Sequence, residues 1–169
     1  GGFHPAPRIS FGDALPIGVS SETELVDLEL TEYRAPAAVR QALNRELPED
    51  IRVLAAEERL RKGASPGASQ ASATYRVPLP ADRPAALAQR LQKFMTSEKV
   101  VVTRLKKDRP VEIDLRPWAS ELKFDDDYLF MVMTSGSPIV LAAYLLEMET
   151  EPVRTLGICK TELTLKDDA

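Results

Sequence analysis

Apolar and polar residues alternate in several short stretches of the first sixty residues, and one stretch between them carries apolar residues at helical spacing. Val26, Leu28 and Leu30 alternate with Asp27 and Glu29, which is typical of a strand with one buried face. The helical stretch begins at one proline and ends before another, as helices commonly do. We expect three strands, at residues 8–15, 25–31 and 51–56, and a helix at residues 36–47.

The second part of the chain has stronger apolar patterns. Leu87, Leu91 and Phe94 fall at helical spacing, whereas Tyr128–Thr134 is a short, almost wholly apolar run that is typical of a buried strand. Residues 139–148 are apolar on nearly every side of a helix, so this helix should be largely buried. The expected helices start at Asp82 and Ser137, and the expected strands are 73–79, 100–104, 111–115, 128–134 and 155–165.

A stretch of small and polar residues at 63–72 separates these two series of elements. Its glycines and proline interrupt both periodicities, so we expect a linker. Residues 73–169 follow the order of a split βαβ, ferredoxin-like module with an extra hairpin near residues 100–116. Residues 1–62 follow the same order without its first strand and helix. The predicted fold class is α+β: two ferredoxin-like modules in tandem, the first incomplete, with antiparallel sheets and helices on one face.

The composition narrows the classes of function. The net charge is −4, which argues against nucleic-acid binding over the whole surface. Cys159 is the only cysteine, so an internal disulfide is excluded and a cytoplasmic location is expected. One cysteine and one histidine exclude a Cys/His zinc site within these residues, and we expect no cofactor in this chain. The pattern predicts neither a signal peptide nor contact with a membrane.

His4 is the only histidine, which makes it the first candidate for acid–base chemistry or for a phosphate contact. A structural role is the favoured interpretation, because His4 stands among prolines. Arg8 and Asp13 follow it, and a surface ion pair between these two is favoured over an anion site. One histidine forms no acid–base pair alone. We therefore favour a protein that is not an enzyme, with His4 and Arg8 as the catalytic alternative.

Basic residues gather around the hairpin expected at 100–116. Strand alternation places Arg104 and Lys106 on one face, where they would follow a phosphate backbone with Trp118 available for stacking. The alternative is a solvated hairpin whose charges prevent edge pairing, with interleaved acidic residues that weaken the field. Asp125–Asp127 lacks the spacing of a calcium loop, so we predict a turn there and no metal site. The candidate RNA-binding residues are Arg104, Lys106, Lys107, Arg109, Arg116 and Trp118.

The least generic stretch of the sequence lies near its start. It reads Gly-Phe-His-Pro-Ala-Pro-Arg-Ile-Ser-Phe at 2–11, Ala-Leu-Pro-Ile-Gly-Val-Ser-Ser-Glu at 14–22 and Asp-Leu-Glu-Leu at 27–30. With Val-Glu-Ile-Asp-Leu-Arg-Pro at 111–117, these segments resemble the radical SAM-linked bacterial domain of unknown function. Members of that family usually carry an upstream strand and helix with a Ser-His-Leu-Asp-like segment, which this chain lacks. The resemblance therefore implies a truncated or processed first module.

The resemblance also implies a partner, a radical SAM iron–sulfur protein that would hold the cluster, because a cluster needs several cysteine ligands. The favoured hypothesis is an accessory domain, not catalytic itself, that binds or presents an RNA-related substrate. Two alternatives stay open. One is an RNA-processing enzyme, because the family's layout is similar to that of CRISPR repeat-processing endoribonucleases. The other is a protein-interaction module whose incomplete first half accepts a partner's strand at its sheet edge.

Overall fold

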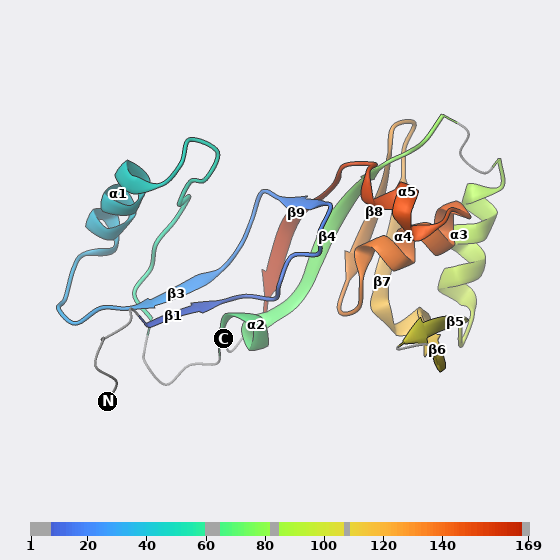
Figure 1. The fold of residues 1–169 in the computed structure, drawn as a ribbon, viewed down its shortest axis with the longest axis horizontal. Helices are drawn as coiled ribbons and strands as arrows, with labels where there is room; N and C mark the ends of the chain where they lie inside the picture. Colours follow the sequence, from blue (N-terminus) through green and yellow to red (C-terminus); the bar gives the residue numbers. More distant parts are fainter. Residues whose placement is uncertain (1–7, 60–64, 82–84, 107–108, 167–169) are drawn as a thin grey trace.

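The computed structural model describes residues 8–59, 65–81, 85–106 and 109–166. The molecule is elongated, as Figure 1 shows. A two-stranded ribbon and helix α1 (Pro36–Glu46) form one end, a five-stranded sheet lies in the middle, and helix α3 (Leu87–Thr96) lies at the other end. The fold class is mixed α+β, as predicted.

The central sheet has the strand order β2-β9-β4-β8-β7. Neighbouring strands are antiparallel, except that β2 runs parallel to β9. This pair corrects the expectation of purely antiparallel sheets, and it joins a strand near the start of the chain to one near its end. The strands are β2 (Val19–Ser21), β4 (Gln70–Pro78), β7 (Ala119–Phe124), β8 (Tyr128–Met133) and β9 (Ile158–Leu165).

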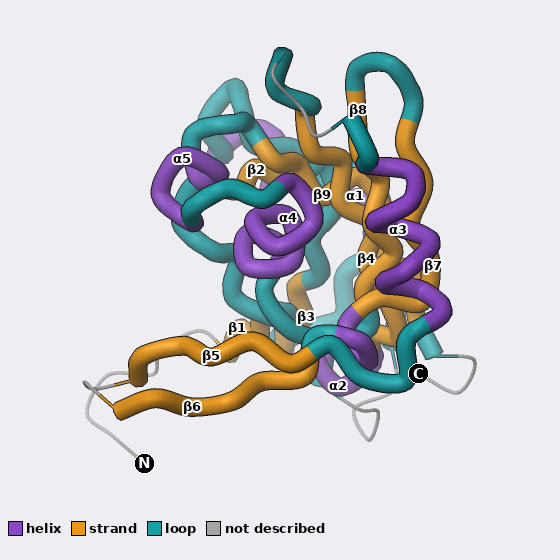
Figure 2. The backbone as a smooth tube through the Cα atoms, turned by 90° about the vertical axis from the view of Figure 1, so that its right-hand side faces the viewer, coloured by secondary structure: helices purple, strands orange, loops and turns teal. Residues whose placement is uncertain are grey.

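Three helices cover one face of this sheet, namely α3, α4 (Pro138–Leu146) and α5 (Thr150–Arg154), as Figure 2 shows. Leu129, Met131 and Met133 of β8 are 0%, 0% and 3% exposed and belong to the core beneath the helices. Every residue of α4 except Tyr144 is buried, which confirms the prediction of a largely buried helix. The apolar area removed from water here, at about 25 cal/mol per Å², stabilises the fold.

Between β4 and β7 the chain forms α3 and then a hairpin that projects from the body (Figure 2). The hairpin consists of β5 (Val101–Lys106) and β6 (Arg109–Asp114), which form a two-stranded sheet of their own. This confirms the extra hairpin predicted at 100–116. Helices α4 and α5 connect β8 to β9.

The first part of the chain departs most from the predicted module. β1 (Arg8–Phe11) and β3 (Val26–Glu29) form an antiparallel ribbon, and α1 buries none of its residues. The strand predicted at 51–56 is wrong. The Val53 N–H donates to Asn44 Oδ1 at 2.7 Å, and Asn44 Nδ2 donates to the Val53 carbonyl at 3.0 Å. A side chain of α1 therefore takes the place of a neighbouring strand.

The predicted linker is also shorter than expected. Its last residues form the short helix α2 (Pro66–Ser69) and the start of β4. There Gln70 pairs with Leu165 of β9. Residues 60–64 lie outside the described part of the chain. So does the predicted start of the following helix at Asp82, and the described helix α3 begins at Leu87.

Candidate nucleic-acid interface

The candidate interface is the β5–β6 hairpin, whose base is anchored by Asp114. The Asp114 Oδ1 atom accepts hydrogen bonds from the backbone N–H groups of Val100 at 2.8 Å and Arg116 at 3.0 Å. These bonds favour the carboxylate and lower the pKa of Asp114 below its ordinary value. Val102 and Ile113, which pair with each other, pack against the core. The base is therefore fixed while the tip projects (Figure 2).

The pairing register sorts the charged residues of the hairpin by sign. Arg104 pairs with Val111, and Arg109 lies two residues before Val111, so both arginines belong to one face. Glu112 pairs with Thr103 and belongs to the opposite face. Asp114 lies two residues after Glu112 and so belongs to the same face as Glu112, whereas Asp108 lies outside the described part of the chain.

We call Arg104 and Arg109 the basic face. Both residues are exposed, and among the described residues neither has an ion-pair partner. Their guanidinium groups are therefore available to an anion from solution. Lys106 is the Cα partner of Arg109, but its side chain and the whole of Lys107 lie outside the described part of the chain.

Arg116 and Trp118 do not join the basic face. They lie in the 3-10 turn η1 (Arg116–Trp118) that leads from the hairpin to β7. The Arg116 guanidinium donates to the carbonyls of Ala119 at 2.9 Å and Met95 at 3.1 Å. Trp118 is partly buried and packs closely against Gly136. Both predicted RNA-binding residues are thus engaged in contacts with the body of the molecule.

A family match covers most of the chain, including the hairpin. Residues 1–154 match the model of DUF2344, described as an uncharacterized protein conserved in bacteria. The chain belongs to this family. The match confirms the expected membership of an uncharacterised bacterial family, and no curated protein matches the sequence.

In this DUF2344 chain the predicted ion pair between Arg8 and Asp13 is wrong. The register of β1 and β3 sets Arg8 opposite Glu29, and Arg8 Nη1 lies 3.1 Å from Glu29 Oε2. The pair is exposed, and such pairs are worth about 0–1 kcal/mol. His4 lies outside the described residues, so catalysis by His4 with Arg8 stays a prediction.

The Asp125–Asp127 stretch forms the turn between β7 and β8, as predicted. Asp125 Oδ1 accepts from the backbone N–H groups of Asp127 at 2.9 Å and Tyr128 at 2.7 Å. Within the described part of the chain, no group of three or more His, Cys, Asp or Glu side chains converges as a metal site. None of the helices described there has the length and apolar character needed to cross a membrane.

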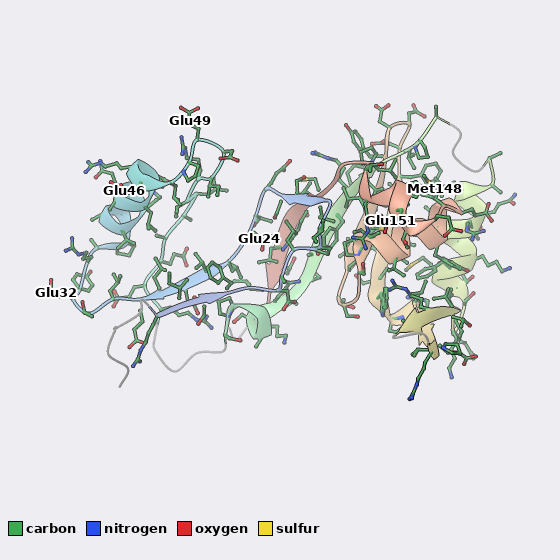
Figure 3. All side chains as sticks on the ribbon, in the orientation of Figure 1. Glu24, Glu32, Glu46, Glu49, Met148 and Glu151 are labelled. Carbon is green, nitrogen blue, oxygen red and sulfur yellow. The ribbon has the colours of Figure 1, made fainter. Side chains whose placement is uncertain are left out.

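One ion pair with a buried lysine has no counterpart among the sequence-based predictions. Lys160 is 2% exposed, and its Nζ lies 2.6 Å from Oε1 of Glu24, on the connection between β2 and β3 (Figure 3). Tyr75 pairs with Lys160 across the sheet, and burial, followed by the charges of Glu24 and Asp13, raises its pKa. The signal in the sequence that could have predicted this pair is the single lysine at the otherwise apolar start of β9. The pair ties the first part of the chain to the sheet.

Proposed function

We propose that this DUF2344 chain is a non-catalytic, RNA-binding accessory domain whose basic face contacts the phosphate backbone. The observation that carries the proposal is the separation of charge by the hairpin register. Arg104 and Arg109 share one exposed face of a projecting ribbon, and Glu112 belongs to the other. Guanidinium groups that have no ion-pair partner among the described residues are well suited to phosphate oxygens.

The distribution of charge over the molecule supports the same surface. The net charge of −4 would repel RNA if it were spread evenly. Glu32 and Glu49 lie at the outer rim of the α1 end of the molecule, far along its long axis from the hairpin, so these two charges do not act on the hairpin (Figure 3). Because exposed charges are screened within about 8 Å at physiological salt, the local field at the hairpin is set by its own residues.

The accessory role and the fold are proposed on separate grounds. The resemblance to the radical SAM-linked domain supports an iron–sulfur partner. Cys159 alone cannot supply the several cysteine ligands that a cluster within these 169 residues would need. The order β9-β4-β8-β7, with α3 and α4 as crossovers, supports a ferredoxin-like, split βαβ arrangement for the second half. Such sheets are a common framework for binding RNA.

Charge reversal on the hairpin tests the proposed function. The double variant Arg104→Glu with Arg109→Glu should bind cellular RNA about tenfold more weakly than the wild type, by fluorescence anisotropy at fixed salt. The matched control is Arg45→Glu with Lys93→Glu, which makes the same change in net charge at exposed positions of α1 and α3. Equal losses in both double variants would show a general charge effect and would contradict the hairpin assignment.

A second candidate function, the docking of a partner's strand, is favoured by the β1–β3 ribbon. Ile9 and Phe11 share one face with Val26, and their exposed fractions are 44%, 72% and 44%. A two-stranded ribbon is marginally stable alone, so an added strand would complete its sheet. This candidate predicts concentration-dependent association in analytical ultracentrifugation that is lost in Phe11→Lys. A monomer at every concentration would count against it.

A further inference from the structure

The face of the central sheet opposite α3, α4 and α5 is unusually apolar along β8. In an antiparallel sheet with one face toward water, the outward residues of each strand are normally polar. On β8 the outward residues, which alternate with the buried ones, are Tyr128, Phe130 and Val132, and each is partly exposed. The helices lie on the other face (Figure 2), so these side chains do not serve the main core.

Cationic residues flank the aromatic rings on this face. The Arg76 guanidinium lies over the ring of Tyr128, with Cζ 5.4 Å from the centroid, and the centroids of Tyr128 and Phe130 are 6.2 Å apart. In the pairing register, Phe130 is opposite Arg76 on β4 and opposite Lys123 on β7. One cation therefore stands on each side of Phe130, at about one strand spacing, 4.8 Å, in each direction.

Both cations are held by exposed carboxylates. Arg76 Nη2 lies 3.1 Å from Oε1 of Glu22, and Lys123 contacts Glu121. The side chains of Glu22 and Glu121 are 57% and 49% exposed, and pairs of this kind stabilise proteins by about 0–1 kcal/mol. A phosphate would therefore displace either carboxylate at little cost. The charges on the face nearly balance, so binding there would depend on stacking more than on net charge.

We propose that Tyr128 and Phe130 form a stacking surface for the unpaired bases of single-stranded RNA, with Arg76 and Lys123 beside it for the adjoining phosphates. The inference rests on the proposed function and adds the class of RNA and a second contact site. Bases stack on aromatic side chains whatever their sequence, because every base has a π face. Duplex RNA keeps its bases stacked inside the helix, so they are not accessible for stacking on these rings.

A protein partner is the competing occupant, and the chemistry of the face favours RNA. Protein-binding faces have centres that are depleted of charged residues. Here Arg76 covers one ring and Lys123 stands next to the other, which is the combination of aromatic and cationic groups found in sites for single strands.

The test compares a 12-nucleotide single-stranded RNA with the same RNA in a duplex, by fluorescence anisotropy over a salt series. In the double variant Tyr128→Leu with Phe130→Leu, single-strand binding should fall roughly tenfold with an unchanged salt slope, and duplex binding should not change. The matched control is Phe124→Leu, which removes an exposed aromatic ring elsewhere on the sheet. Should the double variant fail to fold, photocrosslinking of the wild type to the RNA should mark residues 125–134.

The outcomes separate this inference from the proposed function. If the wild type binds no RNA, both fail. If it binds RNA but the leucine variant matches the control, or crosslinks avoid residues 125–134, the stacking surface is wrong while the hairpin proposal stands. Loss in the leucine variant with a changed salt slope would also overturn it, because stacking of neutral rings releases no counterions.

Discussion

Arginine residues near the hairpin differ in what their guanidinium groups already bind. Arg104 and Arg109 have no ion-pair partner in the described part of the chain, whereas Arg116 donates to two backbone carbonyls. Arg90 behaves like Arg116, since it donates to the carbonyl of Tyr144 at 3.0 and 2.8 Å. The position of an arginine in the sequence does not reveal this difference, because the acceptors are supplied by the fold.

A glycine beside the hairpin base provides a prediction at this scale. Gly136 has φ +81°, and a Cβ there would lie 2.1 Å from Cδ2 of Trp118. Gly157 has φ +85°, but a Cβ there would meet no described atom within 4 Å. We expect Gly157→Ala to cost about 1–2 kcal/mol from its dihedral alone and Gly136→Ala to cost more, because Trp118 must move.

Chemical denaturation of the two alanine variants, followed by fluorescence, measures this difference. Trp118 is the only tryptophan, so its emission reports on the site directly. Equal losses of unfolding free energy and an unshifted emission in Gly136→Ala would show that Trp118 does not pack there.

The buried hydroxyl of Tyr75 predicts a loss of stability at alkaline pH. Burial, and then the charges of Glu24 and Asp13, raise its pKa above the ordinary value of about 10. The folded state then holds the proton more tightly than the unfolded state, so this contribution is complete below pH 10 and is lost as the pH rises toward the raised pKa. The unfolding free energy of the wild type relative to Tyr75→Phe should fall above pH 10 and be constant at pH 7–9. A pH-independent difference would show that the hydroxyl is solvated.

At the scale of elements, helix α3 should depend on its buried face. Leu91 is 5% exposed, and Leu91→Ala should lower the unfolding free energy by about 2–5 kcal/mol, because it removes packed methyl groups and leaves a cavity. Leu54 is 72% exposed, so Leu54→Ala should change it by less than about 0.5 kcal/mol. Urea denaturation of both variants measures the contrast, and similar losses would contradict the described packing of α3.

Elements with strong local patterns were predictable from the sequence. The apolar runs at β8 and α4 are enough to predict these two elements, because each run is continuous and has residues at its ends that are typical of a boundary. β2 has only three residues and is formed by pairing with the parallel strand β9, which is far away in the chain, so no local pattern predicts it. β7 contains a register shift between Ala119 and Glu121, which breaks the alternation that would have revealed it.

The candidate site was predictable to a similar extent. Alternation predicts that Arg104 and Lys106 share a face, but only the register shows that Arg109 belongs to the face of Arg104. The turn η1 takes Arg116 and Trp118 away from that face, and no local pattern announces it. Tyr128 and Phe130 were visible in the sequence as part of an apolar strand. Only the placement of the helices shows that they face outward.

At the scale of the whole molecule, buried apolar contacts are unevenly distributed. Apart from Val19, every buried member of the core cluster comes from residue 73 or later, and α1 buries no residue. The sheet with α3, α4 and α5 therefore supplies a rigid base for the hairpin. The α1 end has few buried apolar contacts, so we expect it to open more readily.

The central claim, that the basic face neutralises RNA phosphates, is tested most directly by the salt dependence of RNA binding to the wild type. The two arginine–phosphate contacts of the basic face contribute about −1.4 to the slope of log K against log salt concentration for single-stranded RNA. The double variant Arg104→Glu with Arg109→Glu should therefore show a slope that is shallower than that of the wild type by about 1.4. A wild-type slope near zero, or a steep slope that the double variant retains, would contradict the claim.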